Sequence, residues 1–325
     1  MIFLSQKEIQ KIIPLEKIQE IIKAVEKSFY DYGKQKVQMP PKMYLNFSLF
    51  QGDLRIMPSY SEALQMAGTK IVNVHPLNPK FGLKTVMAII ILNDPKTGLP
   101  LALMDGTYIT GLRTGAAGAL AIKYLARKDA KTLGVVGAGQ QAIYQIMAIS
   151  MIKKLKEISV YDINEKAIEK LQKILLKYKI KIKAEPLDKV CQKDLLVTLT
   201  PARKPVVKKE WLKEGVHINA IGADAKGKEE LEPEILKQAR IFVDSFEQAS
   251  HSGEINVPLS KGFIKKEDIA GELSEVIIGK KLGRKSQEEI TIFDSTGLAI
   301  QDLYSANLIF QKAKKLNIGK SLKIF

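Results

Sequence analysis

Cysteine and histidine are scarce in this chain of 325 residues, which has one cysteine, Cys191, and three histidines. A single cysteine cannot form an internal disulfide, and this favours a reducing, cytoplasmic compartment. No His and Cys cluster has the spacing of a metal site, so we expect no metal. Aromatic residues make up only 7% of the chain, and none interleaves with a basic block. Despite a net charge of +16, we therefore expect a basic surface without a nucleic-acid partner.

Long hydrophobic runs are absent as well. The longest strongly apolar run, residues 86–92, is far shorter than the roughly 20 residues that span a bilayer. The apolar start, Met1 to Leu4, is too short for a signal peptide, so we expect no membrane partner. Hydrophobic residues are 46% and charged residues 26% of the chain, as in a globular protein. The length suits two domains of about 100–200 residues each.

The first third of the chain predicts helices followed by strands. Ser5 and Glu8 have the spacing of a capping box, and apolar residues at helical spacing continue to Gly33, interrupted by Pro14. Short or longer strands are expected at residues 43–47, 55–57, 70–74, 84–92 and 99–104, the last two forming a hairpin around the turn at 94–98. Strands that follow one another without helices favour an antiparallel or mixed sheet.

From residue 107 the pattern changes to alternating helices and strands. Residues 110–125 predict a helix whose glycines, Gly111, Gly115 and Gly118, indicate close packing against another backbone. Strands are expected at residues 132–136, 157–161, 180–184, 194–199, 217–221, 241–244 and 290–293. Helices between most of these strands predict a parallel, doubly wound sheet. A last helix, at about residues 298–315, could return to the first domain.

A dinucleotide-binding motif follows the first of these strands. Gly137 permits the tight turn, Gly139 lets the backbone approach a pyrophosphate, and Ala142 keeps helix and strand close. Asp162, after the second strand, can accept hydrogen bonds from ribose hydroxyls and would repel a 2′-phosphate. The strand–turn–helix context disfavours the alternative of a glycine-rich turn without a ligand. We therefore expect NAD rather than NADP, held by Gly137, Ala138, Gly139, Gln140, Gln141 and Asp162.

Further motifs occur in a fixed order along the chain. They read KIVNVHPLNP at 70–79, GLKTV at 82–86, MDGTY at 104–108, LRTGAAG at 112–118, GADAKGKEEL at 222–231 and DSTGLAIQD at 294–302. From about residue 39 to 302 the chain resembles the ornithine cyclodeaminase/mu-crystallin family. Within that family the motifs look most like those of the archaeal alanine dehydrogenases.

The resemblance implies an α/β protein with two domains. A Rossmann domain with a doubly wound parallel sheet, residues 113–299, would bind NAD. A smaller α+β domain, residues 1–112 with 300–325, would bind the substrate and pair with a second subunit in a homodimer. The active site would lie in the cleft between the two domains.

The resemblance also assigns roles to individual residues. Lys70 would act at the reacting carbon and contact the substrate, and Asp224 would be the general acid/base. Lys42 and Arg55 would hold the substrate carboxylate, Arg55 through a bidentate fork. The plainer alternatives are a strand-end lysine for Lys70, a turn or cap residue for Asp224, and two surface charges for Lys42 and Arg55.

Other residues would contact the cofactor. The resemblance places Arg113 near the phosphates and Thr85 near the nicotinamide or the phosphates. It adds four more cofactor residues, which are Thr200, Gly222, Lys228 and Ser295. His75, in a His-Pro turn, is a candidate acid/base, but a structural role is the favoured interpretation.

These residues leave three functional hypotheses. The first is an NAD-dependent dehydrogenase that converts L-alanine to pyruvate and ammonia, and the reverse. The second is ornithine cyclodeaminase, or a related ketimine reductase. In the cyclodeaminase branch a glutamate stands two residues before the Met-Pro pair, where this chain has Arg55; a cation there would repel the ornithine side chain by about 1–4 kcal/mol. The third is a ligand-binding protein without turnover, although Lys70 and Asp224 both remain.

Overall fold

The computed structural model describes residues 1–323, which divide into two compact units. Unit 1 comprises Met1–Arg113 and the chain from Leu298 onward, and unit 2 comprises Thr114–Gly297. The boundary falls within helix α3 (Gly106–Leu125). Within residues 1–323, no helix combines the length and apolarity needed to cross a membrane.

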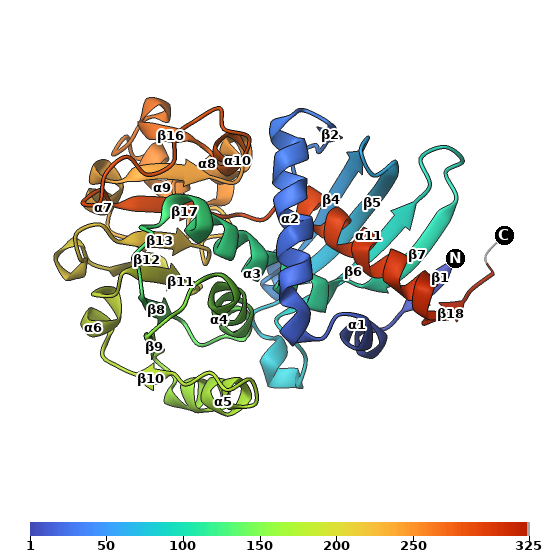
Figure 1. The fold of residues 1–325 in the computed structure, drawn as a ribbon, viewed down its shortest axis with the longest axis horizontal. Coiled ribbons are helices and arrows are strands. Elements are labelled where there is room, and N and C mark those ends of the chain that lie inside the picture. Colours follow the sequence, from blue (N-terminus) through green and yellow to red (C-terminus); the bar gives the residue numbers. More distant parts are fainter. Residues whose placement is uncertain (324–325) are drawn as a thin grey trace. The chain divides into compact units, whose positions relative to one another are not determined.

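Unit 1 is built on a mixed sheet of eight strands (Figure 1). The strands are β1 (Ile2–Leu4), β2 (Val37–Gln38), β3 (Met43–Phe47), β4 (Gly52–Ser61), β5 (Met66–Val74), β6 (Val86–Asn93), β7 (Pro100–Asp105) and β18 (Lys320–Ser321). Their order is β18-β1-β7-β6-β5-β4-β2, with β3 also paired to β4. Only β1 and β7 run parallel in this set of pairs, so the prediction of a mixed sheet is confirmed.

Three helices cover one face of this sheet region. They are α1 (Gln6–Ile12), α2 (Ile18–Gly33) and α11 (Ala299–Leu316). The predicted capping box opens α1, where the Ser5 N–H donates to Glu8 Oε2 at 2.7 Å. Helix α11 packs against β4, β5 and β6, and α2 packs against α11 (Figure 1). The last helix therefore belongs to the same unit as the first sheet.

Strand β4 is much longer than the three residues predicted for it. One edge pairs with β5 at residues 53–61, whereas the other edge pairs with β3 at residues 52–56 and with β2 at residues 60–61. Pro58, which lacks an N–H, lies between the β3-paired and β2-paired segments. A proline is tolerated there because one edge of the strand has no neighbour to receive a hydrogen bond.

Unit 2 contains a sheet of eight parallel strands. The strands are β8 (Thr132–Val136), β9 (Glu157–Tyr161), β10 (Lys183–Ala184), β11 (Leu195–Thr198), β13 (His217–Ala220), β15 (Arg240–Val243), β16 (Ile269–Glu272) and β17 (Thr291–Asp294). Their order is β10-β9-β8-β11-β13-β17-β15-β16. The chain moves outward from β8 to β10 and returns to β11 on the other side of β8, which makes the β8/β11 junction a topological switch point. The prediction of a doubly wound parallel sheet is confirmed.

The remaining elements of unit 2 connect these strands. A separate parallel pair consists of β12 (Arg203–Val207) and β14 (Glu229–Leu231). The helices are α4 (Gln140–Ile152), α5 (Glu165–Leu176), α6 (Leu187–Cys191), α7 (Pro233–Gln238), α8 (Phe246–Ser252), α9 (Asn256–Ser260) and α10 (Leu273–Ile277). Within residues 1–323, 3-10 turns lie at Leu15–Lys17, Ser48–Phe50, Asn78–Phe81, Lys209–Trp211 and Lys266–Asp268.

Helix α3 starts earlier than predicted and packs closely against α4. Its first turn is capped by Asp105, whose Oδ2 accepts a hydrogen bond from the Tyr108 N–H at 2.9 Å. A Cβ at Gly115 would lie 2.4 Å from the carbonyl oxygen of Tyr144, and a Cβ at Gly118 would lie 2.2 Å from Gln145 Oε1. The prediction of close packing at these two glycines is confirmed.

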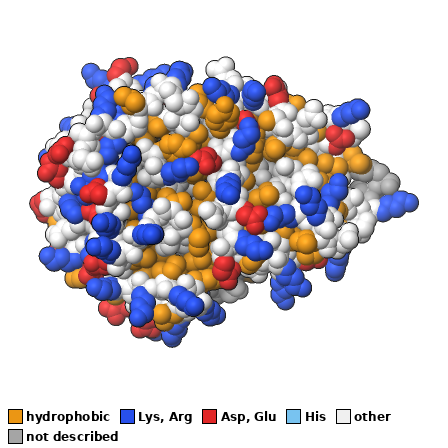
Figure 2. All heavy atoms as spheres, in the orientation of Figure 1, with side chains coloured by type: hydrophobic (Ala, Val, Ile, Leu, Met, Phe, Trp, Pro, Cys, Tyr) orange, Lys and Arg blue, Asp and Glu red, His pale blue; other side chains and the backbone are white. Residues whose placement is uncertain are grey.

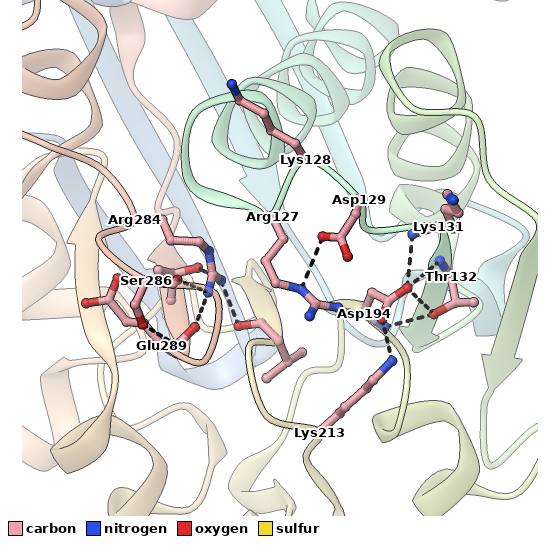
Figure 3. A network of polar contacts seen from close by, with 12 residues as sticks. Arg127, Lys128, Asp129, Lys131, Thr132, Asp194, Lys213, Arg284, Ser286 and Glu289 are labelled. Carbon is pink, nitrogen blue, oxygen red and sulfur yellow. Dashed lines mark hydrogen bonds and ion pairs between the residues drawn. The ribbon is translucent and has the colours of Figure 1, made fainter.

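Asp194 ties together the amino ends of the central strands in unit 2 (Figure 3). Its Oδ2 accepts hydrogen bonds from the N–H groups of Lys131 and Thr132 and from the Thr132 hydroxyl, and its Oδ1 accepts from Arg127 and Lys213. Burial favours the neutral acid, but the hydrogen bonds outweigh it and hold the pKa of Asp194 well below its usual range. This carboxylate is therefore structural.

On the face drawn in Figure 2, the basic side chains are dispersed rather than gathered into one platform. Figure 2 shows Lys and Arg scattered over the drawn face among Asp, Glu and uncharged side chains.

Cys191 is buried in the core of unit 2, and burial raises the pKa of its thiol to about 12. This thiol is therefore protonated and unreactive at neutral pH.

Candidate functional site

The carboxyl edge of the parallel sheet in unit 2 collects most of the predicted cofactor residues. Because all eight strands run parallel, the residues that follow their carboxyl ends lie on one edge of the sheet. The predicted residues on this edge are Gly137 after β8, Asp162 after β9, Thr200 after β11, Gly222 after β13 and Ser295 after β17. The structure thus brings together residues that are up to 158 positions apart, from 137 to 295.

The glycine loop has the geometry of an anion cradle. Gly137 has a φ of +105°, which L side chains rarely adopt, and a Cβ there would lie 3.1 Å from the carbonyl oxygen of Leu199. Gly139 is the N-cap of α4 and provides no side-chain cap, and a Cβ at this position would meet nothing within 4 Å. Gln140 and Gln141 form the first turn of this helix of 13 residues. The helix N-terminus is therefore open to a pyrophosphate, and the loop fits a dinucleotide.

Asp162 lies directly beside this loop. Its Oδ2 accepts a hydrogen bond from the Ala138 N–H at 2.7 Å, and its Oδ1 accepts one from the Asn164 N–H at 2.8 Å. A carboxylate oxygen has two lone pairs, so each oxygen can accept a further hydrogen bond. The geometry is compatible with ribose hydroxyls as additional donors.

A buried carboxylate that sequence reasoning missed joins two of the strand ends. Glu230 Oε1 accepts from the Thr200 N–H at 2.6 Å and from the Thr200 hydroxyl at 2.8 Å. Its Oε2 accepts from the Thr198 hydroxyl at 2.6 Å and from the Gly222 N–H at 2.9 Å. Burial raises the pKa of Glu230, and these hydrogen bonds oppose the rise. Glu230 therefore holds the loops that follow β11 and β13.

Other buried carboxylates support the same edge. Glu254 accepts hydrogen bonds from the N–H groups of Glu230 and Leu231, and burial together with the charge of Glu230 raises its pKa well above the usual value. Asp244 Oδ2 accepts from the Gly297 N–H at 2.6 Å and from the Ser295 hydroxyl at 3.4 Å. Glu254 thus receives its hydrogen bonds from β14, and Asp244 receives these two from the loop after β17.

Asp224 and Lys228 form an ion pair in the loop after β13. Lys228 Nζ lies 2.6 Å from Asp224 Oδ1, and the Asp224 side chain is 32% exposed. The side chain is not the N-cap of a helix, because β14 follows this loop. An ionised, partly exposed carboxylate can take up a proton from a ligand.

Lys70 occupies the middle of β5 in unit 1. It is 2% exposed and pairs with Met57 of β4 and Ile90 of β6. The alternative interpretation as an exposed strand-end lysine is therefore wrong. Its Nζ lies 2.7 Å from Asp302 Oδ2. Burial lowers the pKa of Lys70 to about 7, and Arg113 adds to this effect while Asp302 opposes it.

Arg113 shares the same carboxylate. Its Nε donates to Asp302 Oδ1 at 3.0 Å and its Nη1 donates to Gln301 Oε1 at 3.2 Å, with the side chain buried. Gln301 Nε2 is buried and has no hydrogen-bond partner within residues 1–323. The predicted contact of Arg113 with cofactor phosphates stays a prediction.

Arg55 is buried on the same sheet face as Lys70. Met57 pairs with Lys70, and Arg55 lies two residues before Met57, so Arg55 and Lys70 are diagonal neighbours. The Arg55 guanidinium makes a fork with Asp53, through Nε at 2.8 Å and Nη2 at 3.0 Å, and lies over the Tyr44 ring at 5.4 Å. Arg55 is 5% exposed, so the interpretation as a surface charge is wrong for this residue.

Lys42, Thr85 and His75 complete the predicted residues of unit 1. Lys42 is half-buried ahead of β3, and its charge contributes to lowering the pKa of Lys70. The Thr85 carbonyl accepts a hydrogen bond from the His75 N–H at 2.8 Å. The His75 ring stacks on Phe47 at 6.0 Å between centroids, and it lies against Gly52, where a Cβ would be 2.2 Å from Nδ1. These contacts give His75 a packing role.

Sequence reasoning assigned no role to Glu230, Asp302 or Asp53. Glu230 and Asp302 each stand within one of the quoted motifs, and that position was the only available signal. Their partners are distant in the sequence, as Lys70 is from Asp302, so spacing alone could not pair them. In the part of the chain that the structure describes, no group of three His, Cys, Asp or Glu side chains could hold a metal ion.

Comparisons with known proteins agree over the full length of the chain. The model of the ornithine cyclodeaminase/mu-crystallin family matches residues 2–317. An alanine dehydrogenase of Archaeoglobus fulgidus is 51% identical over 324 residues, covering 100% of this chain and 98% of the relative. A solved structure of an archaeal alanine dehydrogenase dimer with bound NAD has a TM-score of 0.95 at 50% identity, covering 100% of this chain and 99% of that one. The Thermococcus litoralis Δ1-pyrroline-2-carboxylate reductase, solved with NADH and L-proline, has a TM-score of 0.95 at 39% identity, covering 99% of this chain and 100% of that one.

Proposed function

Because the chain belongs to the ornithine cyclodeaminase/mu-crystallin family, we propose that it is an NAD-dependent alanine dehydrogenase. It interconverts L-alanine and NAD⁺ with pyruvate, ammonia and NADH, with water consumed and a proton released in the oxidative direction. The observation that carries the substrate class is the group of buried cations in unit 1. Lys70 and Arg55 lie on one sheet face as diagonal neighbours, and both are nearly inaccessible to solvent.

Buried cations of this kind favour a small anionic substrate. Burying an ammonium or guanidinium group is costly unless an anion accompanies it. Arg55 donates to Asp53 through Nε and Nη2, but a guanidinium has five N–H donors, so Arg55 can also donate to a substrate carboxylate. Lys42 adds a point charge nearby. Alanine and pyruvate both carry a carboxylate and no second cation. Ornithine carries an additional ammonium group, which Arg55 and Lys70 would repel.

The residues of this chain divide the chemistry between them. NAD, when bound, supplies the hydride acceptor for the substrate carbon. Lys70 donates a hydrogen bond to the developing carbonyl oxygen or holds the amino nitrogen in place, which its pKa near neutrality allows in either protonation state. Asp224 accepts the proton of the water that adds to the substrate carbon and returns it to the leaving ammonia.

Most of the proposed cofactor residues lie on the carboxyl edge of the parallel sheet in unit 2. The pyrophosphate would be held by the glycine loop and the start of α4, at Gly137, Ala138, Gly139, Gln140 and Gln141, and the ribose would donate hydrogen bonds to Asp162. The proposed set also includes Thr85, Arg113, Thr200, Gly222, Lys228 and Ser295. The open helix N-terminus at Gly139 and the position of Asp162 support NAD as the dinucleotide.

A cytoplasmic homodimer is part of the same proposal. The sheet face of unit 1 that alternates with Lys70 carries Ile71, Met87 and Ile89 around a hollow of about 560 Å³. Met87 and Ile89 are 37% and 44% exposed, which is unusual for apolar residues in the middle of a sheet. A second copy of this chain would bury them, as the dimeric state described for the archaeal relative suggests.

One set of assays tests the function. We expect NADH formation with L-alanine and NAD⁺, NADH consumption with pyruvate and ammonia, and little activity with ornithine. The likeness to the pyrroline-2-carboxylate reductase makes L-proline and its cyclic imine the necessary comparison. Cyclic-imine reduction without alanine oxidation would replace the proposal with an imine reductase. Proline formation from ornithine without net NADH would replace it with a cyclodeaminase.

A further inference from the structure

Asp302 connects two buried cations of unit 1 through its two carboxylate oxygens. Oδ2 lies 2.7 Å from Lys70 Nζ, and Oδ1 lies 3.0 Å from Arg113 Nε. The Asp302 side chain is 2% exposed and that of Lys70 is 1% exposed, so water cannot replace either partner. Asp302 stands in the first turn of α11, where the positive end of the helix dipole also stabilises a carboxylate.

The neighbours of Lys70 that could influence its proton come from several elements of unit 1. Met57 of β4 and Ile90 of β6 flank it in the sheet and are apolar. Arg55 of β4 is its diagonal neighbour, Arg113 comes from α3, and Lys42 precedes β3. The other carboxylate on this face, Asp53, is paired with Arg55, so Asp302 is the carboxylate paired with Lys70.

We propose that Asp302 is a positioning residue of the substrate site, which holds the Lys70 ammonium in place and determines whether Lys70 keeps its proton. The catalytic consequence rests on the proposed function, whereas the control of the Lys70 proton does not. Without Asp302, burial, Arg113 and Lys42 would all favour neutral Lys70, and the ammonium would lose its nearest anion. With Asp302, the lysine titrates near neutral pH and can serve as donor in one protonation state and acceptor in the other.

The sign of each effect follows from the charges. Replacing Asp302 with Asn removes the negative partner, so the pKa of Lys70 should fall from about 7. An opposite charge within about 4–6 Å typically shifts a pKa by about 1–3 units, so the midpoint should fall by at least about one unit. Replacing Arg113 with Gln removes a positive neighbour and should raise the midpoint. Asp302→Asn and Arg113→Gln are therefore expected to shift the pKa of Lys70 in opposite directions.

A direct measurement follows the Lys70 side chain by NMR. The protein is labelled with carbon-13 at lysine Cε, and the Lys70 resonance is assigned by its loss in Lys70→Arg. We expect midpoints near 7 in the unaltered protein and in Asp302→Glu, a lower midpoint in Asp302→Asn and a higher one in Arg113→Gln. If Asp302→Asn does not fold, Asp302→Ser removes the same charge with a smaller side chain and takes its place, with the same lower midpoint expected. An unchanged midpoint in Asp302→Asn, or a fall in Arg113→Gln, would overturn it.

Asp31 supplies the matched control in the same unit. Its side chain is 1% exposed, is paired with Lys27 at 2.5 Å and accepts a hydrogen bond from the Tyr304 hydroxyl of α11. Asp31→Asn also removes a buried, lysine-paired carboxylate, but it should leave the Lys70 midpoint unchanged. A shift in Asp31→Asn equal to that in Asp302→Asn would show a general structural effect and would overturn the proposal.

The pH dependence of kcat/KM for alanine gives the second readout. The limb of this pH profile that reflects the titration of Lys70 should shift in Asp302→Asn in the same direction as the NMR midpoint. In Asp302→Glu this limb should lie where it does in the unaltered protein. An NMR shift without movement of any limb would overturn the catalytic part of the proposal. If the unaltered protein does not turn over alanine but the NMR midpoints move as expected, the proposed function fails and the control of Lys70 by Asp302 stands.

Discussion

The two units of this protein use buried charge in opposite ways. In unit 1, three buried cations, Arg55, Lys70 and Arg113, share the carboxylates of Asp53 and Asp302. In unit 2, buried carboxylates line the carboxyl ends of the strands, and backbone N–H groups and hydroxyls satisfy them, as for Glu230. A buried carboxylate that accepts hydrogen bonds from backbone N–H groups holds a loop in place. Buried cations that outnumber the carboxylates around them favour an anionic ligand instead.

Unit 2 itself offers a second contrast between the two edges of one sheet. Asp194 joins the amino ends of the strands, away from the predicted cofactor residues, and accepts at least five hydrogen bonds (Figure 3). Glu230 joins the carboxyl ends and contacts Thr200 and Gly222, which are predicted cofactor residues. The hydrogen bonds of Asp194 at the amino edge should therefore affect stability alone. Those of Glu230 at the carboxyl edge should affect both stability and the binding of NAD.

The largest effect is expected at Asp224, the partly exposed carboxylate that pairs with Lys228 in the loop after β13. Asp224→Asn should lower kcat by about 10²–10⁴-fold, because general acid/base catalysis is worth that much, and should leave NAD binding largely intact. Steady-state kinetics and NAD titration of the same preparation check this. Asp129→Asn, at an exposed aspartate paired with Arg127, is the control and should be fully active. A kcat near that of the unaltered enzyme would assign the proton transfer to another group.

Arg55 tests whether the cations of unit 1 serve an anionic substrate. Arg55→Ala should raise KM for alanine and for pyruvate, since both carry the carboxylate. The loss of a charge-assisted hydrogen bond is worth about 1.5–3 kcal/mol, or roughly ten- to a hundredfold. Arg55→Glu should abolish alanine turnover. Arg240→Ala, which removes hydrogen bonds to the carbonyls of Leu282 and Gly283 in unit 2, should lower stability without changing these KM values.

The two edges of the sheet in unit 2 are compared with Glu230→Gln and Asp194→Asn. Each substitution places an amide N–H₂ among donors, so each should lower the free energy of unfolding by about 1–3 kcal/mol. Only Glu230→Gln should also weaken NAD binding, by about tenfold if the loops at Thr200 and Gly222 shift at a cost of about 1.4 kcal/mol. Denaturant unfolding and NAD titration are the measurements. Equal NAD affinity in both variants would remove the distinction between the edges.

The smallest effect is expected at Asp162, which keeps its backbone contacts but should repel a 2′-phosphate. The unaltered protein should bind NAD more tightly than NADP. Asp162→Ser should reduce the difference between the two affinities, mostly by raising the affinity for NADP. The substitution removes the repulsion between the carboxylate and the 2′-phosphate, and serine still accepts a hydrogen bond. Fluorescence titration with the two reduced dinucleotides checks both affinities. Equal affinity of the unaltered protein for the two would contradict the role assigned to Asp162.

Local patterns in the sequence predicted most of the elements correctly. The capping box at Ser5 and Glu8, the hairpin around residues 94–98 and the strand that enters the glycine loop all depend on neighbours within a few positions. The sequence analysis missed the short strands β1, β2, β12, β14, β16 and β18, because two to five residues carry no periodicity of their own. They form because a neighbouring strand offers its edge.

The parallel sheet, the dinucleotide loop and the family resemblance could all be predicted, since each depends on short motifs or on the alternation of helices and strands along the chain. The environment of the charged residues could not be predicted, because it depends on contacts between distant segments. A lysine in the middle of an apolar strand has the same local sequence whether it faces solvent or Asp302, because the face that is buried depends on where α11 packs. In the same way, Glu230 follows another glutamate in the chain, and only the arrangement of β11, β13 and β14 places its carboxylate among Thr198, Thr200 and Gly222. Hydrogen bonds and ion pairs between distant segments arise from packing, and packing is a property of the folded chain.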